Sequence, residues 1–386
     1  MNKNILIIAH QREDFVKYRL SYVNAFLQSN NTLFVLIPAS DRNSLFSSIE
    51  ADIDSRVRIF HYNYNRNKPS ISDFFKLIYL IKNIVIKCKI DIVFSIKIFP
   101  NLCLALSSVI FFRNKPLTKI GLVAGLGILA RNNFTYLVAR KIYFRLLKTL
   151  NKLIVQNNSD FVLLQNVIGP KKVIKTSGSG VNFKIAKSKH SRKEIINSLS
   201  LDYDSNDVIF FCASRLVLEK GILELIEVFS SEYINIKAKL IIVGWFENSK
   251  FEKEFNLKVS NLSNVNYLGN HKSLEVFFEF IDYSILLSYY GEGLSRFLLE
   301  SMQNGKPIVT TITPGCGDLV PNNQNGIIVS NNIDDIVLSV NSLCDLEQSD
   351  YNLMSKKSVS LFNENYAFEK VLDQYKRIFF EVDKII

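Results

Sequence analysis

The chain has 386 residues, of which 48% are hydrophobic, and a formal net charge of +11. This length predicts two domains, and the apolar content is sufficient for two ordinary cores, so a globular protein is expected. The cysteines have no paired spacing and form no ligand cluster with the four histidines, which argues against a disulfide framework or a zinc site. The apolar run in "MNKNILIIAH" is too short for a signal peptide, and no stretch reaches the roughly 20 apolar residues of a spanning helix. A cytoplasmic location is therefore expected.

The first half of the chain alternates short apolar runs with helical stretches. The runs "NILIIAH", "LFVLIP", "DIVFSI" and "KLIVQN" have the polar flanks of buried parallel strands, and "YRLSYVNAFL" has a helical pattern. The Lys/Ser-rich segment 175–191 has the composition of a linker between domains.

The second half repeats this alternation, with strands expected in "DVIFFCASR", "AKLIIVG", "NVNYLGN", "YSILLS", "PIVTT" and "NGIIVS". The sequence thus predicts two Rossmann-like α/β domains, 1–182 and 183–364. The amphipathic segment 365–386 is expected to be a helix that packs on one domain or bridges both. Ligands of parallel sheets bind beyond the carboxyl ends of the strands, so the active site is expected in a cleft between two facing domains.

The two halves have opposite charges. Residues 1–193 hold 31 Lys and Arg against 9 Asp and Glu (+22), and the remainder holds 16 against 27 (−11). Residues 92–159 contain ten cations and no carboxylate. An anionic partner is expected for the first half, but no nucleic-acid-binding signature is present.

Segment 134–152 combines two helical stripes, one of which is basic. The cations on it are Lys141, Arg145, Lys148 and Lys152, and the apolar stripe holds Phe134, Val138, Ile142 and Leu146. Two interpretations stay open: a helix that lies on an anionic bilayer, or a core helix with a solvated basic face.

The stretch "YYGEGLSRFLLESMQNGKPIV" places two glutamates eight positions apart. Glu292 is expected in a loop and Glu300 inside a helix over 293–303, which puts them about 12 Å apart along the axis. The first amides of such a helix attract a phosphate, and carboxylates bind vicinal hydroxyls well. A diphosphate between the two glutamates would have a sugar on one side and a ribose on the other.

Two cations follow the strand in "FFCASRLVLEKG". Arg215 leaves its carboxyl end, and Lys220 lies five residues further on, immediately before a helix that begins near Gly221. Both can therefore converge on one anion.

Together, the Arg-Leu-(three residues)-Lys-Gly and Glu-(seven residues)-Glu segments resemble the retaining GT-B glycosyltransferases. This resemblance implies that Arg215 and Lys220 bind the donor diphosphate, Glu292 contacts the donor sugar and Glu300 holds the ribose. It also implies a donor-binding role for the backbone of Gly293, Leu294 and Ser295, and for Gly269, His271 and Lys272 in "YLGNHKSLE", where such enzymes bind the nucleobase.

Five weaker segments occur in the order found in bacterial capsule and O-antigen glycosyltransferases: "FVKYRLSYVNAFL", "FSIKIFPNL", "GLVAGLGILA", "VQNNSD" and "GSGV". The resemblance implies a UDP-sugar donor, with an N-acetylhexosamine or a deoxy relative as the sugar, and a polyprenyl-diphosphate-linked sugar acceptor. The chain departs from the usual pattern at Lys17-Tyr18, at Asn182 and at Gly317-Asp318, where the last pair replaces Arg-Glu and removes a cation near the donor.

Acceptor-side candidates lie in the first domain. His10 ends the first strand, Lys97 ends another, and two glycines permit close backbone approach to a ligand. The full set is His10, Arg19, Lys97, Gly125 and Gly127.

The expected enzyme is a metal-independent, retaining hexosyltransferase of capsule, O-antigen or lipopolysaccharide synthesis, peripheral on the inner face of the cytoplasmic membrane. The pairs Asp52/Asp54 and Asp202/Asp204 match an Asp-x-Asp metal motif but lie in polar connections, so no metal or other cofactor is expected. Two alternatives remain: a UDP-sugar epimerase of the same fold, and a non-catalytic lipid-binding relative.

Overall fold

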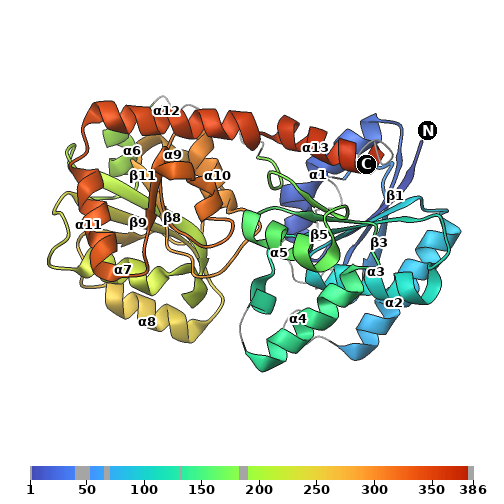
Figure 1. The fold of residues 1–386 in the computed structure, drawn as a ribbon. Helices are drawn as coiled ribbons and strands as arrows, with labels where there is room; N and C mark the ends of the chain where they lie inside the picture. Colours follow the sequence, from blue (N-terminus) through green and yellow to red (C-terminus); the bar gives the residue numbers. More distant parts are fainter. Residues whose placement is uncertain (1, 40–52, 65–69, 131–132, 182–189, 381–386) are drawn as a thin grey trace. The chain divides into compact units, whose positions relative to one another are not determined.

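The computed structural model describes residues 2–39, 53–64, 70–130, 133–181 and 190–380. The chain divides into two compact units (Figure 1). Unit 1 comprises Met1–Gly180 and Val371–Ile386, and unit 2 comprises Val181–Lys370. No helix in the described part of the chain is both long and apolar enough to cross a membrane.

Unit 1 is built on a seven-stranded parallel sheet with the order β3-β2-β1-β4-β5-β6-β7. The strands are β1 (Asn4–Ile8), β2 (Thr32–Pro38), β3 (Arg58–Tyr62), β4 (Ile92–Ile96), β5 (Thr118–Val123), β6 (Lys152–Val155) and β7 (Val173–Lys175). The central strands β1 and β4 are mostly apolar because helices cover both faces of the sheet.

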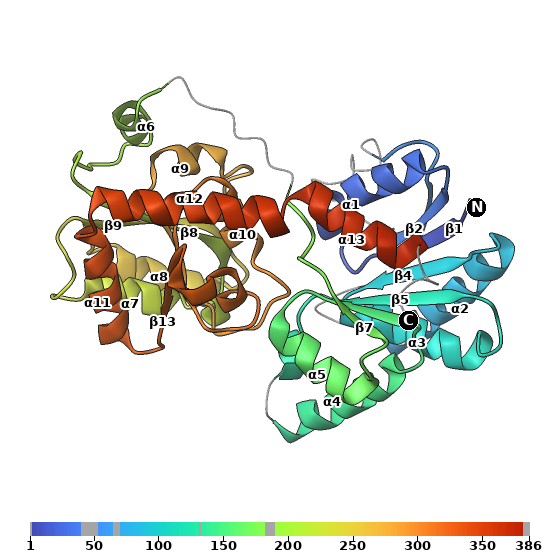
Figure 2. The same cartoon turned by 45° about the horizontal axis from the view of Figure 1, so that its top comes forward.

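The helices of unit 1 form two layers. One layer holds α2 (Ile71–Lys87), α3 (Ile98–Phe111), α4 (Phe134–Leu147) and α5 (Asn158–Ile168). The other holds α1 (Arg12–Gln28) and the part of α13 (Phe368–Phe380) that belongs to this unit. Phe379 packs there between Phe26 of α1 and Phe94 of β4, at ring distances of 5.0 and 5.2 Å. Figure 2 shows α1 and α13 side by side on this face of the sheet.

Unit 2 has a six-stranded parallel sheet with the order β10-β9-β8-β11-β12-β13. Its strands are β8 (Val208–Leu216), β9 (Ala238–Phe246), β10 (Val265–Tyr267), β11 (Tyr283–Leu286), β12 (Ile308–Thr311) and β13 (Gly326–Val329). Its α-helices are α6 (Arg192–Ser198), α7 (Ile222–Ser230), α8 (Ser249–Val259), α9 (Glu275–Phe280), α10 (Arg296–Gln303), α11 (Ile333–Cys344) and α12 (Gln348–Asn365).

The predicted fold class of two Rossmann-like α/β domains is confirmed. In each sheet the strand order reverses beside the first strand, between β1 and β4 in unit 1 and between β8 and β11 in unit 2. Ligands of such sheets bind at this reversal, beyond the carboxyl ends of the strands. The candidate donor residues lie at the end of β8 or after β8, β10 and β11, and the candidate acceptor residues follow β1, β4 and β5.

Two local predictions were wrong. The helix at the two-glutamate segment begins at Arg296 rather than at Gly293, with Ser295 as its N-cap. Lys152 does not belong to the basic helix, because α4 ends at Leu147 and Lys152 begins β6.

Candidate active site

Arg215 lies at the carboxyl end of β8 and pairs with a carboxylate that follows the neighbouring strand. Its Nη1 donates to Glu247 Oε1 at 2.8 Å. Both side chains are more than one-third exposed, so solvent screening limits this pair to about 1 kcal/mol or less. A diphosphate offers the guanidinium a stronger, bidentate partner.

Lys220 ends a short 3-10 helix, η3 (Leu218–Lys220), and its position depends on the glycine that follows. Gly221 has a φ of 67° and opens α7. A Cβ at Gly221 would lie 2.0 Å from the carbonyl oxygen of Leu287, which follows β11. The absence of a side chain therefore lets the η3 turn pack directly against the end of β11, beside the loop that carries Glu292.

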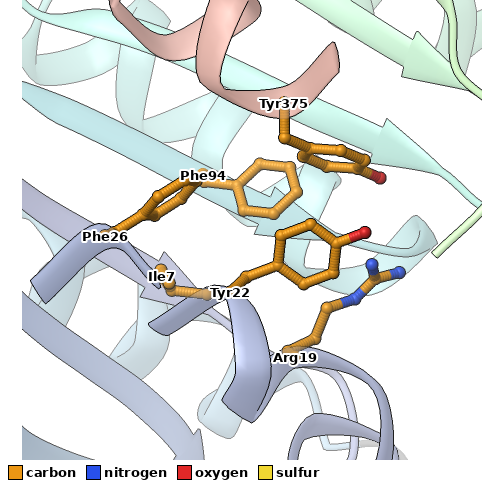
Figure 3. Close-up of a pocket in the computed structure, with 6 residues that line it drawn as sticks. All are labelled: Ile7, Arg19, Tyr22, Phe26, Phe94 and Tyr375. Carbon is orange, nitrogen blue, oxygen red and sulfur yellow. The ribbon is translucent and has the colours of Figure 1, made fainter. Parts of the chain in front are cut away.

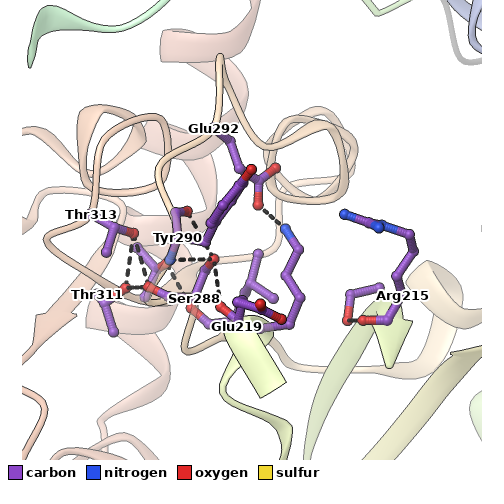
Figure 4. A network of polar contacts seen from close by, with 11 residues as sticks. Arg215, Glu219, Ser288, Tyr290, Glu292, Thr311 and Thr313 are labelled. Atoms are coloured by element: carbon purple, nitrogen blue, oxygen red, sulfur yellow. Dashed lines mark hydrogen bonds and ion pairs between the residues drawn. The ribbon is translucent and has the colours of Figure 1, made fainter. Parts of the chain in front are cut away.

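Lys220 and Glu292 form an ion pair with both side chains largely buried, 11% and 22% exposed (Figure 4). Burial lowers the pKa of Lys220 to about 8, and the positive charge of Arg215 acts in the same direction. Two neighbouring thiols, those of Cys316 and Cys212, act against this shift. Removal of either partner of such a pair would leave a buried charge without compensation.

Hydrogen bonds from three hydroxyl groups hold the loop that carries Glu292. Thr311 and Thr313 both donate through Oγ1 to the carbonyl oxygen of Ser288, at 2.5 and 3.0 Å. Ser288 Oγ in turn donates to the carbonyl oxygen of Tyr290 at 3.1 Å (Figure 4). The backbone carbonyl of Glu219 accepts from the amide of Tyr289 at 2.9 Å. This last bond ties the turn of Lys220 to the loop of Glu292.

A second loop, 313–318, is joined to the same segment by backbone hydrogen bonds. The amide of Glu292 donates to Pro314 O at 2.9 Å, and the amide of Ser295 donates to Gly315 O at 3.0 Å. Gly315 has a φ of 83°, and a Cβ there would lie 2.5 Å from the carbonyl oxygen of Glu292. Asp318 fixes the loop by accepting from the Gly315 amide at 2.8 Å.

These hydrogen bonds change which backbone amides are available to a phosphate. The Ser295 amide is used by Gly315, so it is not one of the amides offered to a ligand. The first turn of α10 instead begins with the amides of Arg296, Phe297 and Leu298. Gly293 and Leu294 lie in the preceding loop, where Gly293 is buried and Leu294 packs on the core.

Glu300 lies inside α10, 8% exposed, and accepts from Arg296 Nε at 2.7 Å. Glu292 lies outside α10. The separation of about 12 Å between the two carboxylates, which assumed a continuous helical rise, therefore does not apply. Arg296 is a cation in the first turn of a helix, where the macrodipole disfavours it. Its pairing with Glu300 offsets this cost and fixes the orientation of that carboxylate.

The residues expected at the nucleobase lie after β10. Gly269 has a φ of 77°, and its carbonyl accepts from the Gly244 amide at 2.9 Å, which joins this turn to the end of β9. The His271 ring contacts its own backbone, with Nε2 3.0 Å from Leu268 O. The imidazole thus holds the turn, and Lys272 next to it is exposed.

The acceptor-side candidates differ in their accessibility. Arg19 is only 7% exposed and faces a small pocket lined by Ile7, Tyr22, Phe26, Phe94 and Tyr375 (Figure 3). His10 stacks at a tilt on Tyr64, with the ring centroids 5.1 Å apart.

Lys97 has a φ of 71° and a ψ of 177°, a conformation that a lysine rarely adopts. It is the N-cap of α3, and its Nζ lies 3.4 Å from Gln11 Oε1, which follows β1. Gly125 and Gly127, with φ values of 84° and 54°, lie in the loop after β5. Lys97, Gln11 and this loop therefore share the carboxyl edge of the sheet.

In the part of the chain that the structure describes, neither Asp-x-Asp pair belongs to a group of side chains that could bind a metal ion. Asp54 pairs with Arg56 at 2.7 Å, and Asp52 lies outside the described residues, as does Asn182. Within the described ranges, no group of three or more His, Cys, Asp or Glu side chains could hold a metal ion.

Sequence reasoning did not predict the contacts of three residues beside the candidate donor residues: Glu247, Arg296 and Asp318. The position of Glu247 could have been predicted from the sequence. Glu247 follows β9, Arg215 lies at the end of β8, and the ends of neighbouring parallel strands lie together. The roles of Arg296 and Asp318 depend on the start of α10 and on the 313–318 loop, which the apolar pattern does not reveal.

The chain is similar to known proteins in sequence and in fold. Residues 191–358 match the family described as glycosyl transferases group 1. The chain is 21% identical, over 96% of its length and 98% of the relative, to the N,N'-diacetylbacillosaminyl-diphospho-undecaprenol alpha-1,3-N-acetylgalactosaminyltransferase of Campylobacter jejuni.

Two solved structures show the same fold over nearly the whole chain. A glycosyltransferase from Rickettsia africae has a TM-score of 0.79, with 18% identity and 99% of each chain covered. HepE from Anabaena, in complex with UDP and glucose, has a TM-score of 0.76, with 16% identity and 98% of this chain and 99% of the other covered.

The fold is therefore that of the GT-B glycosyltransferases. The segment that matches the group 1 glycosyltransferase family lies wholly within unit 2 and contains every candidate donor residue.

Proposed function

We propose that the protein is a retaining glycosyltransferase that moves a sugar from a UDP-sugar to a hydroxyl of a polyprenyl-diphosphate-linked acceptor. The observation that carries this proposal is the buried Lys220–Glu292 pair, braced by two loops at the switch point of unit 2 and accompanied by Arg215. A nucleotide-sugar supplies both an anion for the two cations and hydroxyls for the carboxylate.

The donor diphosphate is bound by Arg215, Lys220 and the first amides of α10. As the bond to the sugar breaks, negative charge accumulates on the departing diphosphate, and preorganised cations stabilise that charge in the transition state. The positive end of the α10 dipole acts in the same sense. These groups supply the neutralisation that a divalent cation would otherwise provide, so turnover does not require added metal.

Glu292 accepts hydrogen bonds from hydroxyls of the donor sugar, and Glu300 from those of the ribose. The hydrogen bond from Arg296 fixes the orientation of that carboxylate. Retention proceeds with the leaving phosphate accepting the acceptor proton, so no side chain is assigned as a general base. The sugar is proposed to be an N-acetylhexosamine or a deoxy relative, as in the name of the Campylobacter relative.

The acceptor is proposed to approach the carboxyl edge of the unit 1 sheet, where Lys97 and the 125–127 loop lie. The +22 charge of residues 1–193 matches an acceptor that carries a diphosphate at an anionic membrane surface. We assign the enzyme to the inner face of the cytoplasmic membrane, in O-antigen or capsule synthesis.

The test is transfer of label from a set of UDP-sugars, with UDP-N-acetylhexosamines first, into the lipid fraction of bacterial membranes. Glu292→Gln should abolish transfer, and Glu252→Gln, an exposed residue of α8, is the matched control. Transfer should persist in excess chelator, and the product should keep the donor's anomeric configuration. Release of an isomerised UDP-sugar without transfer would show an epimerase, and activity in the cell that survives Glu292→Gln would show a non-catalytic role.

A further inference from the structure

The outer layer of unit 1 exposes apolar side chains on neighbouring helices. In α2, Ile71, Phe75 and Tyr79 are 77%, 60% and 57% exposed. In α4, Phe134, Val138 and Ile142 are 80%, 41% and 56% exposed. Both sets have a spacing of four residues, so each forms a continuous stripe about 12 Å long on one helix. We call the surface formed by these six residues the α2–α4 face.

Neither stripe belongs to the core of unit 1. The core side of α2 is formed by other residues, among them Leu77, Ile81 and Val85, so this helix is apolar on two sides. In α4 the buried residues are Tyr143, Phe144 and Leu147. Single exposed apolar residues are ordinary, but two regular apolar stripes on helices of the same layer indicate an interaction site.

The helix between the two stripes is apolar as well. α3 packs against both α2 and α4, and its sequence "IFPNLCLALSSVIF" contains no charged residue. Val109 and Ile110 near its end are about half exposed. Lys82 of α2 lies over the rings of Tyr79 and Phe111, at 5.3 and 4.7 Å, and so joins the outer surfaces of α2 and α3.

The charge around the α2–α4 face is positive. Lys141, Arg145 and Lys148 are exposed on α4, and no Asp or Glu occurs in residues 92–159. The one carboxylate of α2, Asp73, lies 3.6 Å from Lys76. An apolar surface ringed by Lys and Arg is complementary to lipid chains below anionic headgroups. A second copy of the same face would instead bring like charges together.

We propose that the α2–α4 face docks on an anionic bilayer, with the two stripes inserted among the lipid chains. α2 and α4 begin after the carboxyl ends of β3 and β5, and α3 begins immediately after its N-cap Lys97. The docked face thus adjoins the sheet edge that carries the acceptor-side candidates. This inference deepens the membrane part of the proposed function and names the surface that carries it.

The test is sedimentation of the full-length protein with sucrose-loaded vesicles of phosphatidylcholine containing one-third phosphatidylglycerol, without donor or acceptor. Phe75→Ser combined with Phe134→Ser and Ile142→Ser removes apolar area without changing charge. The matched control is Tyr233→Ser with Ile236→Ser and Leu257→Ser, which are equally exposed in unit 2. The apolar variant should lose about tenfold or more in vesicle affinity, and the control should bind as the unchanged protein does.

Replacing Lys141, Arg145 and Lys148 by Gln should weaken binding to the anionic vesicles by a similar factor and make the remaining binding insensitive to salt.

Equal binding by all variants, or equally strong binding to pure phosphatidylcholine, would overturn the proposal. So would a dimer in light scattering that the apolar variant dissociates, because the occupant would then be a second copy. Transfer to a water-soluble, short-chain acceptor should survive in the apolar variant, which separates failure of docking from failure of the proposed catalysis.

Discussion

Units 1 and 2 share a central strand order but differ in how they use their surfaces. In unit 2 the cations of the donor site are paired, as in Lys220–Glu292 and Arg215–Glu247, and within the described residues no helix exposes more than one large apolar side chain. In unit 1, cations outnumber carboxylates, and α2 and α4 each expose a regular apolar stripe. We propose that the same scaffold supports a site for charge chemistry in unit 2 and a surface for docking in unit 1.

The largest effect is expected at Lys220. Lys220→Ala removes the most buried cation of the proposed diphosphate site and the positive charge with which Glu292 pairs, so kcat/KM should fall by about 10²- to 10³-fold. Steady-state kinetics with saturating acceptor would measure this change. Vesicle binding should stay unchanged, and a loss of both properties would break the assignment of chemistry and docking to separate units.

The next effect concerns Gly221. Gly221→Ala places a Cβ within 2.0 Å of Leu287 O and puts a side chain at a φ of 67°, so we expect about 3 kcal/mol of destabilisation together with loss of transfer. Thermal unfolding would report the first and the transfer assay the second. Gly169→Ala in unit 1, also at positive φ but with no atom near its Cβ, should be milder.

The alkaline limb of the activity profile tests the titration of Lys220. With a pKa of about 8 in the folded protein, Lys220 loses its charge as pH rises through 8, so kcat/KM should fall there. Lys220→Arg should remove this limb because a guanidinium does not titrate in the range. The pKa of an ordinary lysine is 10.5, so between about pH 8 and pH 10.5 Lys220 binds more protons in the unfolded chain than in the folded protein. The contribution of Lys220 to the free energy of unfolding therefore rises with pH over this range. An alkaline loss of activity that accompanies unfolding would contradict this account.

A smaller effect is expected at Arg296. Arg296→Gln frees the Glu300 carboxylate from its fixed orientation and should raise KM for the UDP-sugar about tenfold while changing kcat little. Trp245, the only tryptophan of the chain, is half exposed at the end of β9 and lies opposite Arg215 in the strand pairing, so its fluorescence can follow donor binding. If kcat fell as much as KM rose, Arg296 would contact the reacting groups themselves.

The smallest effect is expected at Glu247. Its pair with Arg215 is exposed to solvent, so Glu247→Gln should change the affinity for UDP by no more than about fivefold. A loss comparable to that of Lys220→Ala would mean that Glu247 binds the donor directly.

The sequence was sufficient for the fold and for part of the site. Buried parallel strands are nearly continuous apolar runs, and Arg215, Lys220 and Glu292 all follow the ends of such runs. The start of α10 was misplaced because Gly293 and Ser295 can both precede a helix, and the choice is made by the 313–318 loop, which is distant in sequence. The stripe on α2 was missed because this helix is apolar on two sides, and periodicity does not say which side the sheet covers.

The central claim is that Lys220 binds the donor diphosphate in its charged form. Calorimetry of UDP binding at pH 8, in two buffers that differ in ionisation enthalpy, measures this directly. We predict an uptake of about half a proton per UDP bound in the unchanged protein, because the phosphates keep Lys220 charged, and no uptake together with at least about tenfold weaker binding in Lys220→Ala. Equal affinity and equal proton uptake in the two proteins would contradict the account.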